Sequence, residues 1–168
     1  DHGRLILDWE RRYALMKTHT AEHILYRSIE NLFNVKFQKV ELNEAESSLF
    51  INGNISIDDI SRAEDLANSI IEKNLKLKIY YGKMESVDED VRIRKDRIKD
   101  ENVRIVEIEG FDKSACTGIH VKSTGEIGSV FVKSVKKAYL FEIKFLSGEA
   151  AKKFVFENAR ILRKISMN

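Results

Sequence analysis

The sequence predicts an α+β fold in one domain, with a mainly antiparallel sheet backed by helices. Two observations lead to this class. Segments in which apolar residues recur at helical spacing are interspersed with short segments in which every second residue is apolar. No internal repeat, low-complexity tract or linker divides the chain. With 168 residues, 43% of them hydrophobic, the chain is long enough to bury one sizeable core.

The first half of the chain is predicted to contain two helices separated by a β-hairpin. Helices are expected where apolar residues recur every three or four positions, and strands where they alternate. Ser56 followed by Asp59 resembles a capping box, which marks the start of the second helix. The expected elements are, in order, a short strand at residues 4–8, a helix at 10–33, strands at 35–43 and 48–51, and a helix at 56–74.

The second half is predicted to contain strands and one last helix. A strand is expected at residues 75–85, with Leu75, Leu77, Ile79 and Tyr81 on one face. The charges of both signs at 85–100 indicate a solvated helical face, and a basic face that follows phosphates is the alternative. The other expected elements are strands at 103–108, 130–135 and 138–146 and a helix ending near Ile165, which should bury Ala150, Ala151, Phe154, Val155, Ala159 and Leu162.

Composition limits the class of protein. With 29 basic and 27 acidic residues the formal net charge is +2, which neither requires nor excludes a nucleic acid partner, so a phosphate-binding surface would have to be local. A single cysteine excludes an internal disulfide and fits a reducing compartment. No apolar run approaches the roughly 20 residues of a membrane helix, and no secretory signal begins the sequence. We therefore expect a cytoplasmic protein without a membrane partner.

Two pairs of metal-ligand residues dominate the sequence. His19 and His23 are four residues apart, so in a helix their imidazoles lie on one face. Cys116 and His120 repeat this spacing, and the two pairs account for the only cysteine and three of the four histidines. A histidine on a helix is often an ordinary core or surface residue, but one thiolate with three imidazoles is a tetrahedral set that zinc favours. The spacing predicts one Zn²⁺ per chain.

These motifs and their surroundings resemble the editing domain of alanyl-tRNA synthetase and its free-standing relatives. The resemblance covers nearly the whole chain and rests on WERR at residues 9–12, HTAEH at 19–23, CTGIHV at 116–121 and TGEIG at 124–128. Metal motifs of the same spacing occur in the editing domain of bacterial threonyl-tRNA synthetase, whereas TGEIG is similar to the alanyl branch. The resemblance implies a zinc-containing editing domain over residues 10–168, with residues 1–9 as the remnant of a preceding segment.

The implied function is hydrolysis, in trans, of the ester that joins the wrong amino acid to tRNA(Ala). Because serine differs from alanine by one hydroxyl, an apolar synthetic pocket rejects it poorly, and a second site must hydrolyse the product. The expected partner is tRNA(Ala) carrying serine or glycine. Two alternatives stay open, a threonyl-type editing domain acting on Ser-tRNA(Thr) and a non-catalytic, zinc-stabilised tRNA-binding module.

The resemblance also implies roles for three residues besides the four metal ligands. Gln38 matches a pocket position of the family and is expected to contact the serine hydroxyl or the attacking water, the alternative being an exposed strand glutamine. Glu22 stands next to His23, where it could orient a ligand or act as general base, or form an ordinary helix salt bridge. Thr20, between the histidines, is expected to face the pocket unless it is an ordinary helical threonine.

The chain departs from the synthetase pattern at three places. Thr117, Gly118 and Ile119 stand where synthetases usually have two glycines and a threonine, Glu22 stands where they often have threonine, and residues 139–148 lack the arginine-rich character of the synthetase segment. Mechanism stays open as well, because four protein ligands close a zinc site. Either Cys116 gives way so that the metal activates water, or zinc orders the pocket and a water held by Gln38 attacks.

Overall fold

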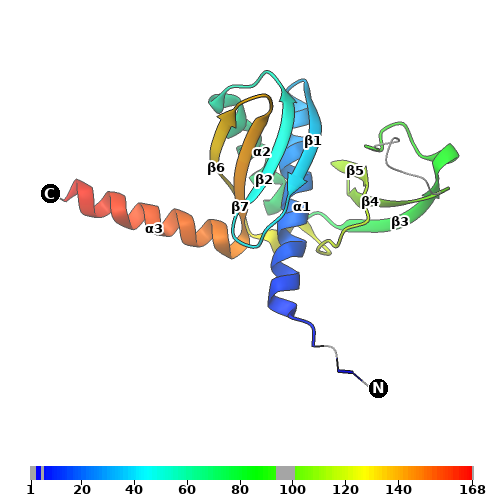
Figure 1. The fold of residues 1–168 in the computed structure, drawn as a ribbon, viewed down its shortest axis with the longest axis horizontal. Coiled ribbons are helices and arrows are strands. Elements are labelled where there is room, and N and C mark those ends of the chain that lie inside the picture. The colour runs from blue at the N-terminus through cyan, green and yellow to red at the C-terminus, as the bar shows by residue number, and fades with distance from the viewer. Residues whose placement is uncertain (1–2, 5, 94–100, 168) are drawn as a thin grey trace.

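The computed structural model describes residues 3–4, 6–93 and 101–167 and has an α+β fold (Figure 1). The predicted class, antiparallel strands backed by helices, is confirmed. Most boundaries differ from the expected ones by no more than three residues. In chain order the elements are α1 (Trp9–Leu32), β1 (Val35–Glu41), β2 (Ser47–Gly53), α2 (Ile57–Glu72), β3 (Leu77–Lys83), η1 (Met84–Ser86), β4 (Asn102–Ile108), β5 (Asp112–Ala115), η3 (Thr124–Ile127), β6 (Val130–Lys137), β7 (Phe141–Ser147) and α3 (Gly148–Ser166).

The described strands form two antiparallel sheets, where the sequence predicts one. The larger sheet has the order β1-β2-β7-β6 and the smaller one β3-β4-β5. The small sheet forms because the chain turns back at Gly110, whose φ of 69° lies in the left-handed region that suits glycine, so that Ile108 pairs with Asp112. Sequence analysis missed β5 because this strand has only four residues and follows a segment assigned to a loop.

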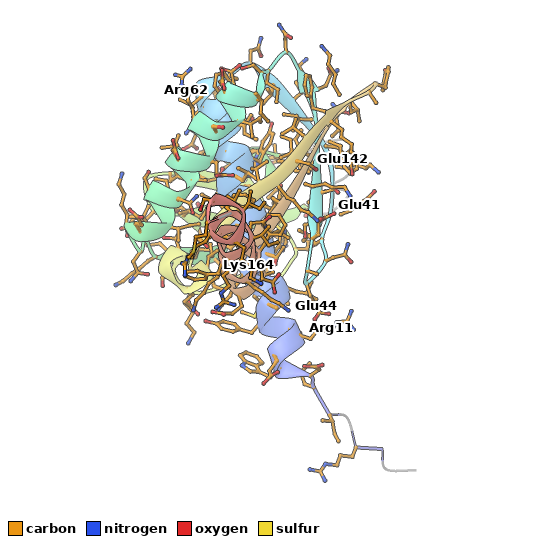
Figure 2. The ribbon with its side chains drawn as sticks, turned by 90° about the vertical axis from the view of Figure 1, so that its left-hand side faces the viewer. Arg11, Glu41, Glu44, Arg62, Glu142 and Lys164 are labelled. Carbon is orange, nitrogen blue, oxygen red and sulfur yellow. The ribbon has the colours of Figure 1, made fainter. Side chains whose placement is uncertain are left out.

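Helix α1 is the element that both sheets share. It contacts β1, β2 and β7 of the large sheet and β5 of the small sheet, and Figure 1 shows it passing between the two. The carboxylate of Asp8 caps the helix by accepting a hydrogen bond from the backbone N–H of Arg11. Arg11 also forms an ion pair of 2.8 Å with Glu44 of the β1–β2 loop, and the two side chains lie beside each other in Figure 2. These contacts fix the helix at its N-terminal end.

The main core lies between α1, α2 and the large sheet. Helix α2 begins with the predicted capping box, in which Ser56 Oγ accepts from the N–H of Asp59 and the Asp59 carboxylate accepts from the N–H of Ser56. A separate, smaller cluster under the small sheet is formed by Val91, Val103 and Ile105. The fully buried side chains of the main core include Ile24, Leu25, Ile29, Leu49, Ile51, Ile60, Ala63, Ala67, Ile143 and Phe145.

Three predicted features differ from the structure. The described residues among 4–8 form no strand. Along the alternating face of β3, Leu77 is partly buried against the main core, whereas Tyr81 is 72% exposed, because β3 is an edge strand of the small sheet. In the charged segment 85–100, the only helical turn among the described residues is the one at Met84–Ser86, and residues 94–100 lie outside the described residues.

Helix α3 projects away from the rest of the molecule (Figure 1). Of the six side chains expected to be buried only Ala151 is, whereas Val155 is 44% and Leu162 66% exposed. The cause is the direction in which the chain leaves β7, at Gly148 with φ of 57°, so that only the start of the helix meets the large sheet. In the described part of the chain, no helix combines the length and hydropathy of a membrane-spanning segment.

The capping box gives a stability prediction. Replacing Ser56 by alanine removes the acceptor for the N–H of Asp59, and we expect it to lower the free energy of unfolding by about 1 kcal/mol. Ser61→Ala, an exposed position inside the same helix, is the matched control and should leave stability within about 0.5 kcal/mol. Urea unfolding followed by circular dichroism measures both. Equal stability of the two variants would contradict the role of the cap.

Candidate metal centre

The four predicted metal ligands converge on one point. His19 and His23 project from the middle of α1, Cys116 directly follows β5, and His120 lies in the loop before η3. One ligand atom from each residue can be chosen so that all four lie within 4.8 Å of one another. The Sγ atom of Cys116 is 3.4 Å from Nε2 of His19 and 3.4 Å from Nε2 of His120. The convergence joins residues separated by about a hundred positions in the sequence.

This arrangement fits a tetrahedral metal ion. With zinc bonds to nitrogen and sulfur of ordinary length, the nitrogen and sulfur ligands of one ion lie about 3.6 Å apart. The two observed separations of 3.4 Å need little adjustment to reach that value. Three imidazoles and one thiolate also match the ligand preference of zinc better than that of magnesium or calcium, which favour oxygen.

His120 is oriented by Thr20. The Thr20 hydroxyl lies 2.9 Å from the backbone oxygen of Met16, to which it donates its only proton, and 3.1 Å from Nδ1 of His120. Because the hydroxyl proton is committed to Met16, Nδ1 of His120 carries the hydrogen and donates to Thr20. Nε2 of His120 therefore keeps its lone pair and faces Cys116. Thr20 is completely buried behind this ring.

His23 is oriented in the same manner from the small sheet. Its Nδ1 atom lies 2.8 Å from the hydroxyl of Ser114 and 3.5 Å from a carboxylate oxygen of Asp112. A carboxylate can only accept, so Nδ1 of His23 carries a hydrogen, and Nε2 is the nitrogen that would bind the ion. Both His23 and His120 thus present the same nitrogen to the site.

The loop that carries Cys116 is held by backbone contacts. The guanidinium of Arg104 donates to the carbonyl oxygens of Cys116 and, at 2.9 Å, of Gly118. The N–H of Gly118 in turn donates to Cys116 Sγ at 3.4 Å. Gly118 packs directly on the imidazole of His19, in a space that a β-carbon would fill. Glycine at this position is required by the close approach of the ring.

The charges of the site suit a metal ligand set. Burial would raise the pKa of the Cys116 thiol, but contacts with the rings of His120, His19 and His23 and the charge of His23 lower it to about 3. Burial would lower the pKa of His23, but hydrogen bonds to Asp112 and Cys116 and the charge of Glu22 raise it to about 9. Burial lowers the pKa of His120 to about 4, so this ring is neutral. Without metal the site is a thiolate beside an imidazolium.

Glu22 lies on α1 beside His23, and Gln38 lies on β1, a strand that contacts α1. Glu22 is buried, and its carboxylate is 3.8 Å from Nε2 of His23. Gln38 is half-buried on β1, at the point where the pairing of β1 with β2 shifts register between Phe37 and Lys39. Such bulges re-aim side chains. The N–H of Phe37 donates to the hydroxyl of Tyr26 on α1, which holds this part of β1 against the helix that carries the histidines.

Two cavities lie elsewhere. One of about 510 Å³ and one of about 340 Å³ occur near the start of α3, lined among others by Lys17, Glu149 and Gly148. Neither is lined by the four ligand residues, Glu22 or Gln38. The candidate metal site is therefore recognised from the convergence of its four ligand residues and from the hydrogen bonds that orient them, and not from a cavity.

Sequence reasoning missed three residues of the site, Asp112, Ser114 and Arg104. The first two precede Cys116 by four and two positions, so in a strand all three side chains share one face. Recognising β5 as a strand would have placed a carboxylate and a hydroxyl beside the thiol. Arg104 carries no such signal, because its role depends on the pairing of β4 with β5.

Fold and site together define an α+β protein with a Cys/His cluster, between a helix and a small antiparallel sheet, that could hold a metal ion. Comparison with known proteins narrows this class. Residues 103–153 match the family described as the threonyl and alanyl tRNA synthetase second additional domain. This confirms the resemblance to the alanyl-tRNA editing family that the sequence motifs indicated, and the fold agrees with it.

Several relatives are alanyl-tRNA editing proteins or alanine–tRNA ligases. The chain is 35% identical over 152 residues to the alanyl-tRNA editing protein AlaX-L of Pyrococcus horikoshii, which covers 88% of this chain and 37% of that protein. It is 30% identical over 142 residues to AlaX-M of Methanosarcina acetivorans, covering 81% and 58%. It is 30% identical over 141 residues to the alanine–tRNA ligase of Staphylothermus marinus, covering 79% and 15%. The chain thus spans only part of each of these relatives.

The close packing of Gly118 gives a prediction about metal affinity. A methyl group in Gly118→Ala would collide with the ring of His19, and we expect zinc affinity to fall at least about tenfold. Thr117→Ala, an exposed change in the same loop, is the control and should bind zinc like the wild type. Competition with a chromophoric chelator measures both. Equal affinity of the Gly118 variant and the control would contradict the packing argument.

The pKa values predict how zinc binding depends on pH. Below about 9 His23 holds a proton that zinc must displace, whereas Cys116 is already a thiolate above about 3. Affinity should therefore rise roughly tenfold per pH unit from neutral pH and level off once His23 is deprotonated. Calorimetry in buffers of different ionisation enthalpy should show about one proton released at neutral pH. Affinity that is independent of pH below 9 would contradict this assignment.

Proposed function

We propose that this chain is a zinc-dependent aminoacyl-tRNA deacylase that hydrolyses wrongly charged tRNA(Ala) in trans, with Ser-tRNA(Ala) as main substrate and Gly-tRNA(Ala) as a second. The observation that carries the proposal is the convergence of His19, His23, Cys116 and His120, on two motifs typical of editing domains. The similarity to alanyl-tRNA editing proteins supports the choice of tRNA(Ala). In this proposal residues 10–168 form the editing domain.

The four ligands would hold Zn²⁺, which supplies a Lewis acid next to the ester when bound. The reaction adds water to the ester carbonyl, breaks the bond between that carbon and the ribose oxygen, and yields the free amino acid and uncharged tRNA. The water gives up one proton and the leaving ribose oxygen takes one up. Residues of this chain must therefore hold the water and move a proton.

Glu22 is the residue that we propose as general base. Its buried carboxylate lies 3.8 Å from the ligand nitrogen of His23, so a proton accepted there stays next to the reacting ester. Gln38, on the bulge of β1, is proposed to hold the serine hydroxyl or the water through its side-chain amide. Both donor and acceptor atoms of an amide suit a hydroxyl, which is the group that distinguishes serine from alanine.

Thr20 has a different place in this proposal. Its buried hydroxyl is engaged with Met16 and His120, and these contacts support a role in orienting a metal ligand. Its expected contact with the substrate stays a prediction. A Thr20→Ser variant, which keeps the hydroxyl, and Thr20→Val, which removes it, would separate the two roles by comparing zinc affinity with KM.

The test is deacylation by the purified chain. Ser-tRNA(Ala), Gly-tRNA(Ala) and Ser-tRNA(Thr) are offered separately, with Ala-tRNA(Ala) as the correctly charged control. We expect rapid loss of serine from tRNA(Ala), no effect on Ala-tRNA(Ala), and a rate about 10² to 10⁴ lower for Glu22→Gln. Gln38→Ala should lower the rate for serine more than for glycine, which lacks the hydroxyl. Ser61→Ala, on the exposed side of α2, is the matched control.

Other outcomes would replace the proposal. Cleavage of Ser-tRNA(Thr) alone would indicate a threonyl-type editing domain. Tight tRNA binding without any ester cleavage would indicate a zinc-stabilised binding module. Full activity of Glu22→Gln would exclude that carboxylate as the base and leave the water to Gln38 or to backbone groups.

A further inference from the structure

A buried carboxylate lies behind the metal centre, where it contacts three basic side chains. Asp112, the first residue of β5, has a side chain with 0% exposure. Its oxygens are 2.9 Å from a guanidinium nitrogen of Arg92, 3.4 Å from Nε of Arg27 and 3.5 Å from Nδ1 of His23. Burying a charge is costly unless it is paired and hydrogen-bonded, and here the pairing includes a metal ligand.

We propose that Asp112 is a positioning residue of the metal centre: clamped by Arg27 and Arg92, it fixes the ring of His23 so that Nε2 points to the ion. The inference rests on the proposed zinc site. Ser114, two residues further on the same strand, contributes the closer contact to the same Nδ1 atom, at 2.8 Å. Carboxylates in this position behind a ligating histidine fix its orientation and increase its basicity.

The clamp is built from elements that also carry ligands. Arg27 follows His23 by four residues on α1, so both side chains leave the same face of the helix. The backbone of Arg92 is bonded to β5 on both sides of Ser114, through the carbonyl oxygen of Lys113 at 2.8 Å and the N–H of Ala115 at 2.9 Å. The guanidinium of Arg92 also lies over the ring of Tyr26, which is on α1, at 4.6 Å.

The charges around Asp112 favour its ionised form as a fixed acceptor. Burial would raise its pKa, but the hydrogen bond to His23 and the charges of Arg92 and Arg27 hold the pKa below its usual value. Arg27 also forms an ion pair with Glu30, at 2.7 Å. Asp112 contacts the side of the His23 ring that carries Nδ1, opposite the nitrogen that faces the cluster, so it acts through the ring and is not a fifth ligand.

The test measures metal binding and not hydrolysis. Zn²⁺ affinity is determined by competition with a chromophoric chelator, and Co²⁺ binding by its visible absorption, which reports the geometry of the ligands. We expect Asp112→Ala to weaken Zn²⁺ binding about 10- to 100-fold and to change the Co²⁺ spectrum. Asp112→Asn keeps an oxygen that accepts from Nδ1, so its affinity should lie between those of the wild type and Asp112→Ala.

Lys113→Ala is the matched control. This neighbouring residue on β5 forms ion pairs with the exposed side chains of Asp90 and Asp88, and its loss should leave affinity within about twofold of the wild type. Circular dichroism checks that each variant is folded. If Asp112→Ala does not fold, Asp112→Asn decides the question, because it preserves the size of the side chain closely.

Each outcome has a distinct meaning. A folded Asp112 variant with the affinity and Co²⁺ spectrum of the wild type would overturn the positioning role while leaving the metal centre intact. A wild-type chain that binds neither Zn²⁺ nor Co²⁺ would overturn the metal centre itself, and this role with it. The positioning role would be established if Asp112→Ala weakens binding, Asp112→Asn weakens it less, and Lys113→Ala binds like the wild type.

Discussion

The candidate site depends on one partly buried thiolate that packs among three imidazoles, two of them buried. Taken singly, each of these polar groups would be costly to remove from water, and Cys116 in particular is stabilised as an anion only because the histidines surround it. Hydrogen bonds from neighbouring residues hold these groups in place. Thr20 holds one ring, Ser114 and Asp112 hold a second, and Arg104 fixes the loop between Cys116 and Gly118.

Helix α1 makes this convergence possible. It supplies two ligands four residues apart, the base that we propose for hydrolysis and one arginine of the Asp112 clamp. It packs on both sheets and contacts β1 as well as β5, the strand that leads into Cys116. A helix interior is rigid, which suits a site whose geometry must be held closely. The proposed function thus follows from one helix placed between two sheets.

Much of the fold and the convergence of the four possible metal ligands was predictable from the sequence, for identifiable reasons. Helical periodicity and the capping box at Ser56 are local signals, and they gave α1 and α2 nearly correctly. The ligands followed from spacing and from the scarcity of cysteine. Sequence could not show that α3 leaves the sheet, because amphipathic spacing is the same whether or not a partner is present. Nor could it show that Arg92 contacts the buried Asp112, since that depends on its pairing with β5.

The separation of the two hydrophobic clusters has one further consequence. Val91, Val103 and Ile105 form a second cluster at the small sheet, while Ile108 and Leu77 of the same sheet reach the main core. The ligand cluster and the ionic network behind it join α1 to β5 of the small sheet. An ion bound there would cross-link these two elements. Withdrawal of the ion should then loosen the junction of α1 with β5 first, and amide hydrogens of β5 should exchange with solvent sooner than those of β2 and β7.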